Sequence, residues 1–279
     1  MFAKIRQSLM RTYNAWNDHE GMRLAASLSF YSILSLAPLV ILAISLVALV
    51  VGRSAAQTAV ITQVQGLMGA DGAQAVQSVI AHAQSPSGGA LASAIGLVTL
   101  LFGASGVFGE LQSALNKIWE AKPPTGSGWW YMVRTRLFSF GMVLGIGFLL
   151  LVSLLLSAGL AALSGYLGDV LPLPKVLLSV LNFVVSFLGI SFLFALIFKY
   201  VPDAPVRWRD VWLGAVVTAL LFTIGKALIG LYLGRAAVGS AYGAAGSLIV
   251  VIVWVYYSAM IFFFGAEFTH VRARGQVPL

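Results

Sequence analysis

The sequence predicts an all-α polytopic membrane protein with six transmembrane helices, and three observations support this fold class. Apolar residues make up 59% of the 279 residues and charged residues only 9%, against about 25% charged in a soluble domain. Several uncharged stretches exceed the length of about 20 residues that crosses a bilayer. Lysine and arginine also alternate in abundance from one loop to the next, as they do in membrane proteins of fixed orientation.

The first predicted span covers residues 24–51 and contains Pro38. A proline inside a helix removes one backbone hydrogen bond, so we expect this helix to bend there. The basic residues 1–23 that precede it are predicted to form a cytoplasmic leader. Residues 53–86 are more polar but keep helical spacing of their apolar side chains, which predicts short amphipathic helices in the first outer loop, joined between Gly69 and Gly72.

The second predicted span covers residues 90–109 and carries a glycine stripe at Gly103, Gly106 and Gly109. Such a stripe allows a neighbouring helix to approach closely. The charged segment 110–136, with prolines at 123 and 124, is expected to be a solvated connection. The remaining spans of this single transmembrane domain are predicted at 137–163, 176–200, 211–234 and 247–268, followed by a cytoplasmic tail at 269–279.

The distribution of basic residues predicts the orientation. If the N-terminus is cytoplasmic, thirteen of the 17 lysines and arginines lie on the cytoplasmic side, and each outer loop holds a single one, at Arg53, Lys175 and Arg235. Both termini are therefore predicted to be cytoplasmic. The net charge of +8 is explained by orientation, so no nucleic-acid partner is expected. The cytoplasmic basic residues are Lys4, Arg6, Arg11, Arg23, Lys117, Lys122, Arg134, Arg136, Lys199, Arg207, Arg209, Arg272 and Arg274.

The sequence carries no recognisable catalytic or metal-binding motif. It has no cysteine, which excludes disulfides and thiolate sites. His19, His82 and His270 fall on the leader, the outer segment and the tail, so we expect them not to converge on a metal. No phosphate-binding loop, nucleophile elbow or zinc-binding helix is present. We therefore predict that the protein is not an enzyme and has no cofactor.

Lys226 is the one charge predicted to lie well inside a span. An unpaired ammonium in hydrocarbon costs a few kcal/mol or more, and the residues expected at its depth, among them Asn182, include no carboxylate. Two interpretations remain open. Lys226 either extends toward the membrane surface as a structural residue, or it faces a cavity and contacts an anionic substrate or lipid phosphate.

Two further patterns within the spans each allow a structural and a functional interpretation. Ser27, Tyr31 and Ser35 recur every four residues and so form a polar line on one helix face, which either bonds a neighbouring helix or lines a polar path. Spacing typical of close helix packing also occurs in three glycine pairs. The three pairs favour tight helix packing or a homodimer. They are Gly141 with Gly145, Gly230 with Gly234, and Gly239 with Gly243.

Four separated blocks of the chain resemble the BrkB/YihY family of bacterial inner-membrane proteins, in the order found in that family. The blocks are AASLSFYSILSLAPLVI at 25–41, GASGVFGELQSALNKIWE at 103–120, FKYVPDAPVRWRDVWLGA at 198–215 and AYGAAGSLIVVIVWVYYSAMIFFFGAEFTHV at 241–271. With the hydropathy between them, the resemblance covers nearly the whole chain. It implies a six-span protein of the bacterial inner membrane.

The resemblance implies less about activity. The family carries an older ribonuclease BN label, a virulence-factor label and more recent suggestions of a part in moving lipids. The ribonuclease label fits this sequence poorly, because RNA hydrolysis needs clustered acid–base groups or metal ligands. The resemblance implies structural or pathway roles for Pro38, Asn116, Trp119, Pro202, Gly214, Tyr242, Gly246, Gly265 and Glu267.

Two functions follow as expectations. The first is transport or flipping of a lipid or amphipathic anion, with membrane lipids as partners and with Lys226, Ser27, Tyr31, Ser35 and Asn182 as candidate path residues. The second is a scaffold for envelope machinery that transports nothing. A cavity reaching Lys226 would favour transport, and a closely packed bundle would favour a scaffold.

Overall fold

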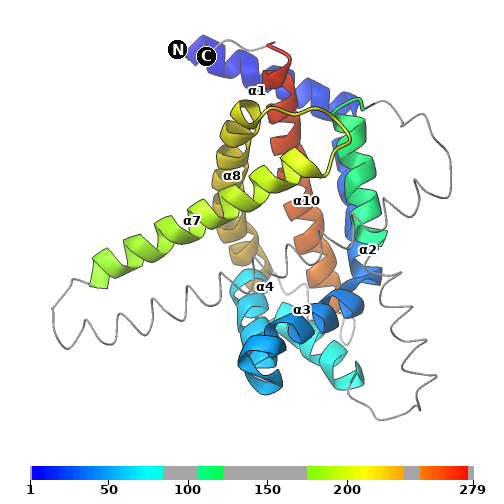
Figure 1. Cartoon of the computed structure of the whole chain (residues 1–279), viewed down its shortest axis with the longest axis vertical. Coiled ribbons are helices and arrows are strands. Elements are labelled where there is room, and N and C mark those ends of the chain that lie inside the picture. The colour runs from blue at the N-terminus through cyan, green and yellow to red at the C-terminus, as the bar shows by residue number, and fades with distance from the viewer. Residues whose placement is uncertain (1, 84–105, 122–174, 236–245, 276–279) are drawn as a thin grey trace.

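The computed structural model describes residues 2–83, 106–121, 175–235 and 246–275, and within these ranges the chain is almost entirely helical, with no strand. Three helices there are long and apolar enough to cross a membrane, and a bent pair of helices can form a fourth span. The all-α membrane fold is thus confirmed (Figure 1). Most of the second predicted span and the whole of the third, 137–163, lie outside the described residues.

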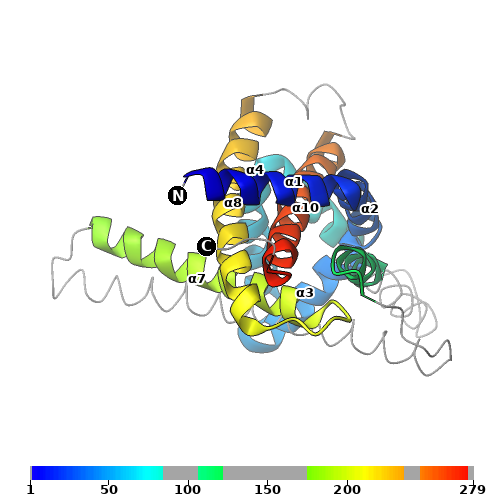
Figure 2. The ribbon, with the colours of Figure 1, turned by 90° about the horizontal axis from the view of Figure 1, so that it is seen from above.

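The predicted leader is a helix that lies across the bundle. Helix α1 (Phe2–Asp18) runs over one end of the bundle (Figure 2) and packs on α10. It meets α2 (Gly21–Leu34) in a tight corner, where Glu20 has a φ of 60°. The Trp16 indole lies over Gly21, where an added Cβ would come within 2.1 Å of Nε1. A glycine is therefore required at this corner.

The bend predicted in the first span is confirmed. Helices α2 and α3 (Leu36–Val51) meet at an angle of 63°. Pro38 occupies the first turn of α3, and in a continuous helix its ring would clash with the carbonyl four residues earlier, at Leu34. Helix α2 ends at that residue, and the amide of Ser35 closes its last turn by donating to Tyr31 O at 3.0 Å.

Helix α4 (Arg53–Ala83) contains the helix junction expected in the first loop. Gly69 has φ 79° and ψ −169°, so two helical segments meet there. Glycine adopts this backbone conformation without the strain that a Cβ would cause. Helix α4 packs against α3 through a small apolar cluster, which consists of Val40, Ile44, Val47, Ala56, Val76 and Ile80.

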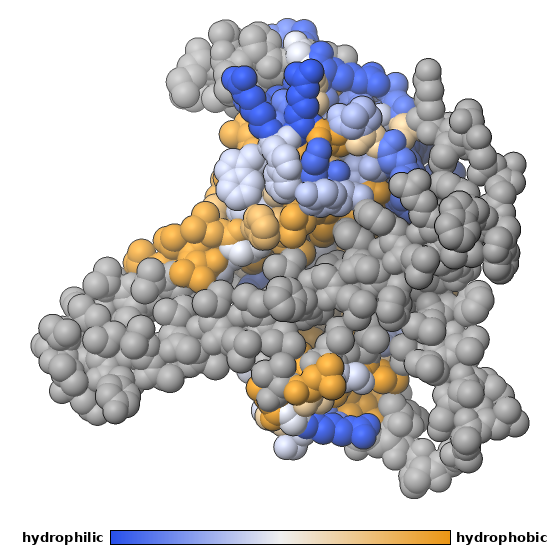
Figure 3. Space-filling view, in the orientation of Figure 1, coloured by the Kyte–Doolittle hydropathy of each residue, from blue (hydrophilic) through white to orange (hydrophobic). Residues whose placement is uncertain are grey.

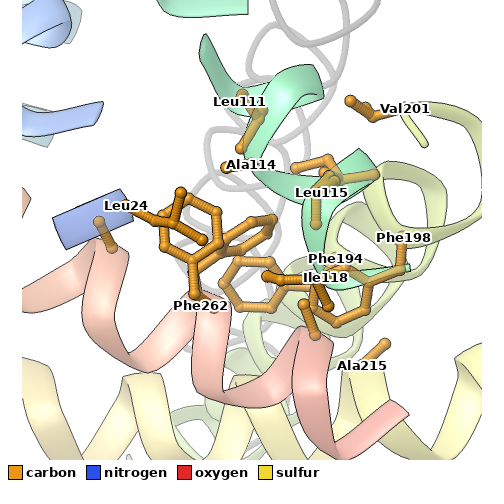
Figure 4. Close-up of a cluster of buried hydrophobic side chains, with 14 of the residues drawn as sticks. Leu24, Leu111, Ala114, Leu115, Ile118, Phe194, Phe198, Val201, Ala215 and Phe262 are labelled. Atoms are coloured by element: carbon orange, nitrogen blue, oxygen red, sulfur yellow. The ribbon is translucent and has the colours of Figure 1, made fainter. Parts of the chain in front are cut away.

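The main core joins α7 (Lys175–Tyr200), α8 (Trp208–Arg235), α10 (Gly246–Ala273) and the helical stretch 106–118. Figure 4 shows side chains from these segments meeting in one cluster. The prediction of a solvated connection from residue 110 is wrong for this stretch. Its buried side chains recur at helical spacing, a signal that the neighbouring charges obscured. They are Leu111, Ala114, Leu115 and Ile118.

Helices α8 and α10 approach closely through two matched glycine–threonine pairs. Gly214 of α8 faces Thr269 of α10, and Gly265 of α10 faces Thr218 of α8. Each threonine is fully buried and donates its hydroxyl to the glycine carbonyl one turn earlier in its own helix, at 2.7 Å for Thr218 and 2.8 Å for Thr269. Each threonine hydroxyl is thus hydrogen-bonded within its own helix, and the facing glycine leaves room for the threonine side chain.

The surface is divided by polarity along the bundle. Hydrophilic residues gather at the end that carries α1 and the last turns of α10, and a hydrophobic band lies next to it (Figure 3). We call the end that carries α1 and the last turns of α10 the terminal end. The α3–α4 pair lies toward the opposite end (Figure 1). This distribution is typical of helices that pass through hydrocarbon between two aqueous faces.

Candidate functional site

A pocket of about 330 Å³ lies between α3 and α4 and is open on one side. More than half of its lining residues are apolar, and three polar side chains join them, one from within α3 and two from the first turns of α4. Helix α3 leaves the line of α2 at the bend and packs against α4, and the pocket lies between α3 and α4. Its lining residues are Ile41, Ile44, Ser45, Ala48, Arg53, Gln57 and Ile80.

Arg53 is the charged group of this pocket. Its side chain is exposed and has neither an ion pair nor a hydrogen bond within the described part of the chain. The hydroxyl of Ser45 donates to Ile41 O at 2.7 Å and so is satisfied within its own helix. Arg53 and Gln57 are one helical turn apart and therefore lie on the same face of α4. The pocket thus presents an apolar wall with a cation at one edge.

The polar line predicted on the first span does not reach this pocket. Ser35 is buried, and both Tyr31 and Ser35 lie beside Gly106, where an added Cβ would meet the Tyr31 ring at 3.4 Å and Ser35 Oγ at 3.9 Å. One glycine of the predicted stripe therefore faces a neighbouring helix. Ser27 is half-buried. Ser29, which the sequence did not single out, donates to Ile252 O at 3.0 Å and ties α2 to α10.

Lys226 lies in α8 with its side chain exposed. The adjacent Gly225 faces Ile261 and Tyr257, which lie in the middle of α10. Lys226 of α8 is therefore level with the middle of the apolar helix α10. The pocket lining does not include Lys226. Asn182 belongs to α7, and its side chain is outside the described parts.

A buried polar cluster lies at the terminal end, and sequence reasoning did not anticipate it. Glu267 of α10 is fully buried, and its Oε1 lies within hydrogen-bond distance of His19 Nδ1, at 2.6 Å. The His270 ring packs edge-on against Trp119 with ring centroids 5.1 Å apart, and its centroid is 6.3 Å from that of His19. Glu267 Oε2 and His270 Nδ1 are buried without a hydrogen-bond partner among the described residues.

His19 and His270 thus share one cluster, whereas His82 lies on α4. The spacing of Glu267 and His270, three residues apart on one helix, was the signal available in the sequence. No group of three or more His, Cys, Asp or Glu suited to a metal ion occurs within the described ranges.

Ion pairs surround the cluster on its exposed side. Arg274 Nη2 lies 2.7 Å from Glu120 Oε2, and this hydrogen bond holds the pKa of the Glu120 carboxyl below its ordinary value of 4.5. Lys117 Nζ lies 2.5 Å from Glu20 Oε2 and likewise lowers the pKa of Glu20. Both carboxylates are half-exposed, so each pair is worth little on its own. Together they bring the α1–α2 corner, residues 117–120 and the end of α10 to one place.

A second polar contact holds the turn before α8. Asn116 donates from Nδ2 to Asp203 Oδ2 at 2.9 Å and accepts at Oδ1 from the Asp203 amide at 2.7 Å. Pro202, next to Asp203, is buried.

Most family positions therefore have structural surroundings that account for their residue types. Pro38 lies at the bend, Asn116 holds the turn, and Glu267 and Trp119 belong to the buried cluster. Gly214 and Gly265 face threonines, and Gly246 is buried at the start of α10. Tyr242, and the glycines at 141, 145, 239 and 243, lie outside the described residues. Gly230 has no heavy atom within 4 Å of an added Cβ, so nothing in the described structure packs on it.

The family model described as "Virulence factor BrkB" matches residues 12–278. A UPF0761 membrane protein of Verminephrobacter eiseniae is 34% identical over 188 residues, which is 64% of this chain and 42% of that protein. A UPF0761 membrane protein of Rhodospirillum centenum is 27% identical over 255 residues, 91% of this chain and 54% of the relative. The chain spans about half the length of the curated relatives it matches. No solved structure matches.

The match over residues 12–278 agrees with the four sequence blocks and with the apolar helices of the fold. The relatives are named as membrane proteins and not as enzymes. The chain belongs to the BrkB family of membrane proteins.

Proposed function

We propose that the protein moves a lipid or an amphipathic anion across the bacterial inner membrane, and that its cargo enters at the α3–α4 pocket. The observation that carries this proposal is the 63° break in the first span. Beyond this break α3 packs against α4, and the two helices line a mostly apolar pocket. Its volume falls within the range of about 300–1,000 Å³ that is usual for small-molecule sites.

A reconstituted transport assay tests this. Purified full-length protein is placed in vesicles that contain a fluorescent phospholipid, and a membrane-impermeant reductant reports how fast lipid crosses the bilayer. Ala48→Trp fills the pocket, because Ala48 lines it, and should slow the crossing at least severalfold. Leu49→Trp is the matched control, since the adjacent Leu49 is 83% exposed and its replacement should leave the rate unchanged. Equal rates with and without wild-type protein would refute transport of that lipid.

Lys226 is proposed as a second contact for the anionic end of the cargo. An exposed lysine near the middle of an apolar helix is costly unless it meets water, headgroups or an anion. Lys226→Gln should therefore lower the transport rate in the same vesicles while the protein still folds. An unchanged rate would leave Lys226 as a structural residue that extends toward the surface.

The second candidate function is an assembly partner in the cell envelope that transports nothing. The close contact between α8 and α10 favours it, because interfaces of small residues are typical of rigid helix packing. Folded, pure protein that stays inactive with several lipid classes would favour this reading.

A further inference from the structure

The α3–α4 pocket combines an apolar wall with one cation, Arg53, which has no ion-pair partner within the described ranges. We propose that it is a binding site for one anionic phospholipid, with the phosphate on Arg53 and an acyl chain along Ile41, Ile44 and Ile80. This inference rests on the proposed function and names the ligand of its entry site. It concerns binding, so it can be tested separately from transport.

The position of Arg53 fits a lipid phosphate. The apolar helix α3 ends at Val51, and Arg53 follows after Gly52. Where an apolar helix ends, the hydrocarbon gives way to the headgroup layer. An arginine at that level can form two parallel hydrogen bonds to a phosphate, a geometry that a lysine does not reproduce.

The charge balance around Arg53 also favours an anion. No carboxylate neutralises this guanidinium within the described part of the chain, whereas Arg23, Lys117 and Arg274 each pair with a glutamate. Arg53 is also the first residue of α4, where the helix dipole adds positive potential. Gln57 offers an amide on the same face of the helix and can bond a phosphate or ester oxygen.

The test uses the absence of native cysteine. Ser54→Cys places a single label on an exposed position next to Arg53. The labelled full-length protein is reconstituted with brominated phosphatidylglycerol or brominated phosphatidylcholine of the same acyl chains, and quenching reports the lipid bound beside the label. Phosphatidylglycerol should reach half-maximal quenching at about a tenfold lower mole fraction, the difference expected for one charge-assisted contact.

Three variants define the outcome. Arg53→Gln should abolish the preference for phosphatidylglycerol, and Arg53→Lys should keep only part of it. Arg207→Gln removes the same charge from an exposed position before α8 and should change nothing. Inorganic phosphate should not displace the lipid, because it lacks the acyl chain that the pocket holds. Equal quenching by the two lipids, full preference in Arg53→Gln, or displacement by phosphate alone would overturn the inference.

The two proposals fail in different ways. Binding with the stated preference but no lipid movement would contradict transport and leave the site intact. Lipid movement that is unaffected by Arg53→Gln, with no headgroup preference, would contradict the role of Arg53 and leave transport intact.

Discussion

Glu267 carries a fully buried carboxyl group that is hydrogen-bonded to His19, which lies 248 positions away in the chain. A buried polar group is tolerated only when hydrogen-bonded, and a buried charge is more demanding. The partner comes from the α1–α2 corner, which Trp16 and Gly21 hold in place. The role of His19 is thus to satisfy a group on another helix.

His19→Ala should lower the stability of the protein by about 1–3 kcal/mol, because it leaves the Glu267 carboxyl group buried without its hydrogen-bond partner. Thermal unfolding in detergent measures this. The double variant His19→Ala with Glu267→Met removes both polar groups and should recover most of the loss. Asn14→Ala, at an exposed position of α1, serves as the control. A His19→Ala protein as stable as wild type would show that the contact contributes nothing.

At the scale of elements, the α8–α10 pair depends on glycines placed opposite threonines. An added Cβ on Gly265 would lie 1.9 Å from Thr218 Oγ1 and 2.8 Å from Thr218 Cβ. Because Thr218 Cβ is fixed to the backbone, rotating the hydroxyl away cannot relieve the second contact. The helices would have to separate, with loss of the packing along both.

Gly265→Ala is accordingly expected to lower the unfolding temperature by several degrees, which corresponds to about 1–3 kcal/mol for an overpacked contact. Gly230→Ala is the matched control within α8. No heavy atom of the described residues lies within 4 Å of its added Cβ, so the change should be neutral or slightly stabilising, since alanine favours helix over glycine by about 1 kcal/mol. Thr218→Ala should partly rescue Gly265→Ala. Similar effects of the two glycine variants would contradict the close approach.

For the whole molecule, orientation remains a prediction from the basic residues. Ser54 is the second residue of α4, and Ser113 lies in the helical stretch 106–118. Both serines are exposed. In intact cells a membrane-impermeant maleimide should label Ser54→Cys and should reach Ser113→Cys only after the membrane is opened. The reverse pattern would invert the proposed topology and place the terminal end outside.

Local chemistry explains what could be predicted from the sequence. Apolar content predicted the membrane fold, Pro38 the bend, and Gly69 the junction in α4, because each depends on residues close together in the chain. The helix at 106–118 was missed, since its charged residues outweighed a short apolar pattern. Arg53 was counted for orientation, but its pocket could not be foreseen.

The sequence by itself determined that this chain is an all-α membrane protein that resembles the BrkB family and bends next to Pro38. The tertiary structure alone decided which distant residues meet. Only folding brings His19 to Glu267, threonines of one helix against glycines of another, and α3 beside α4 around the pocket at Arg53. The physical reason is that helix periodicity specifies which face is apolar, whereas the partner of that face depends on the packing of whole helices.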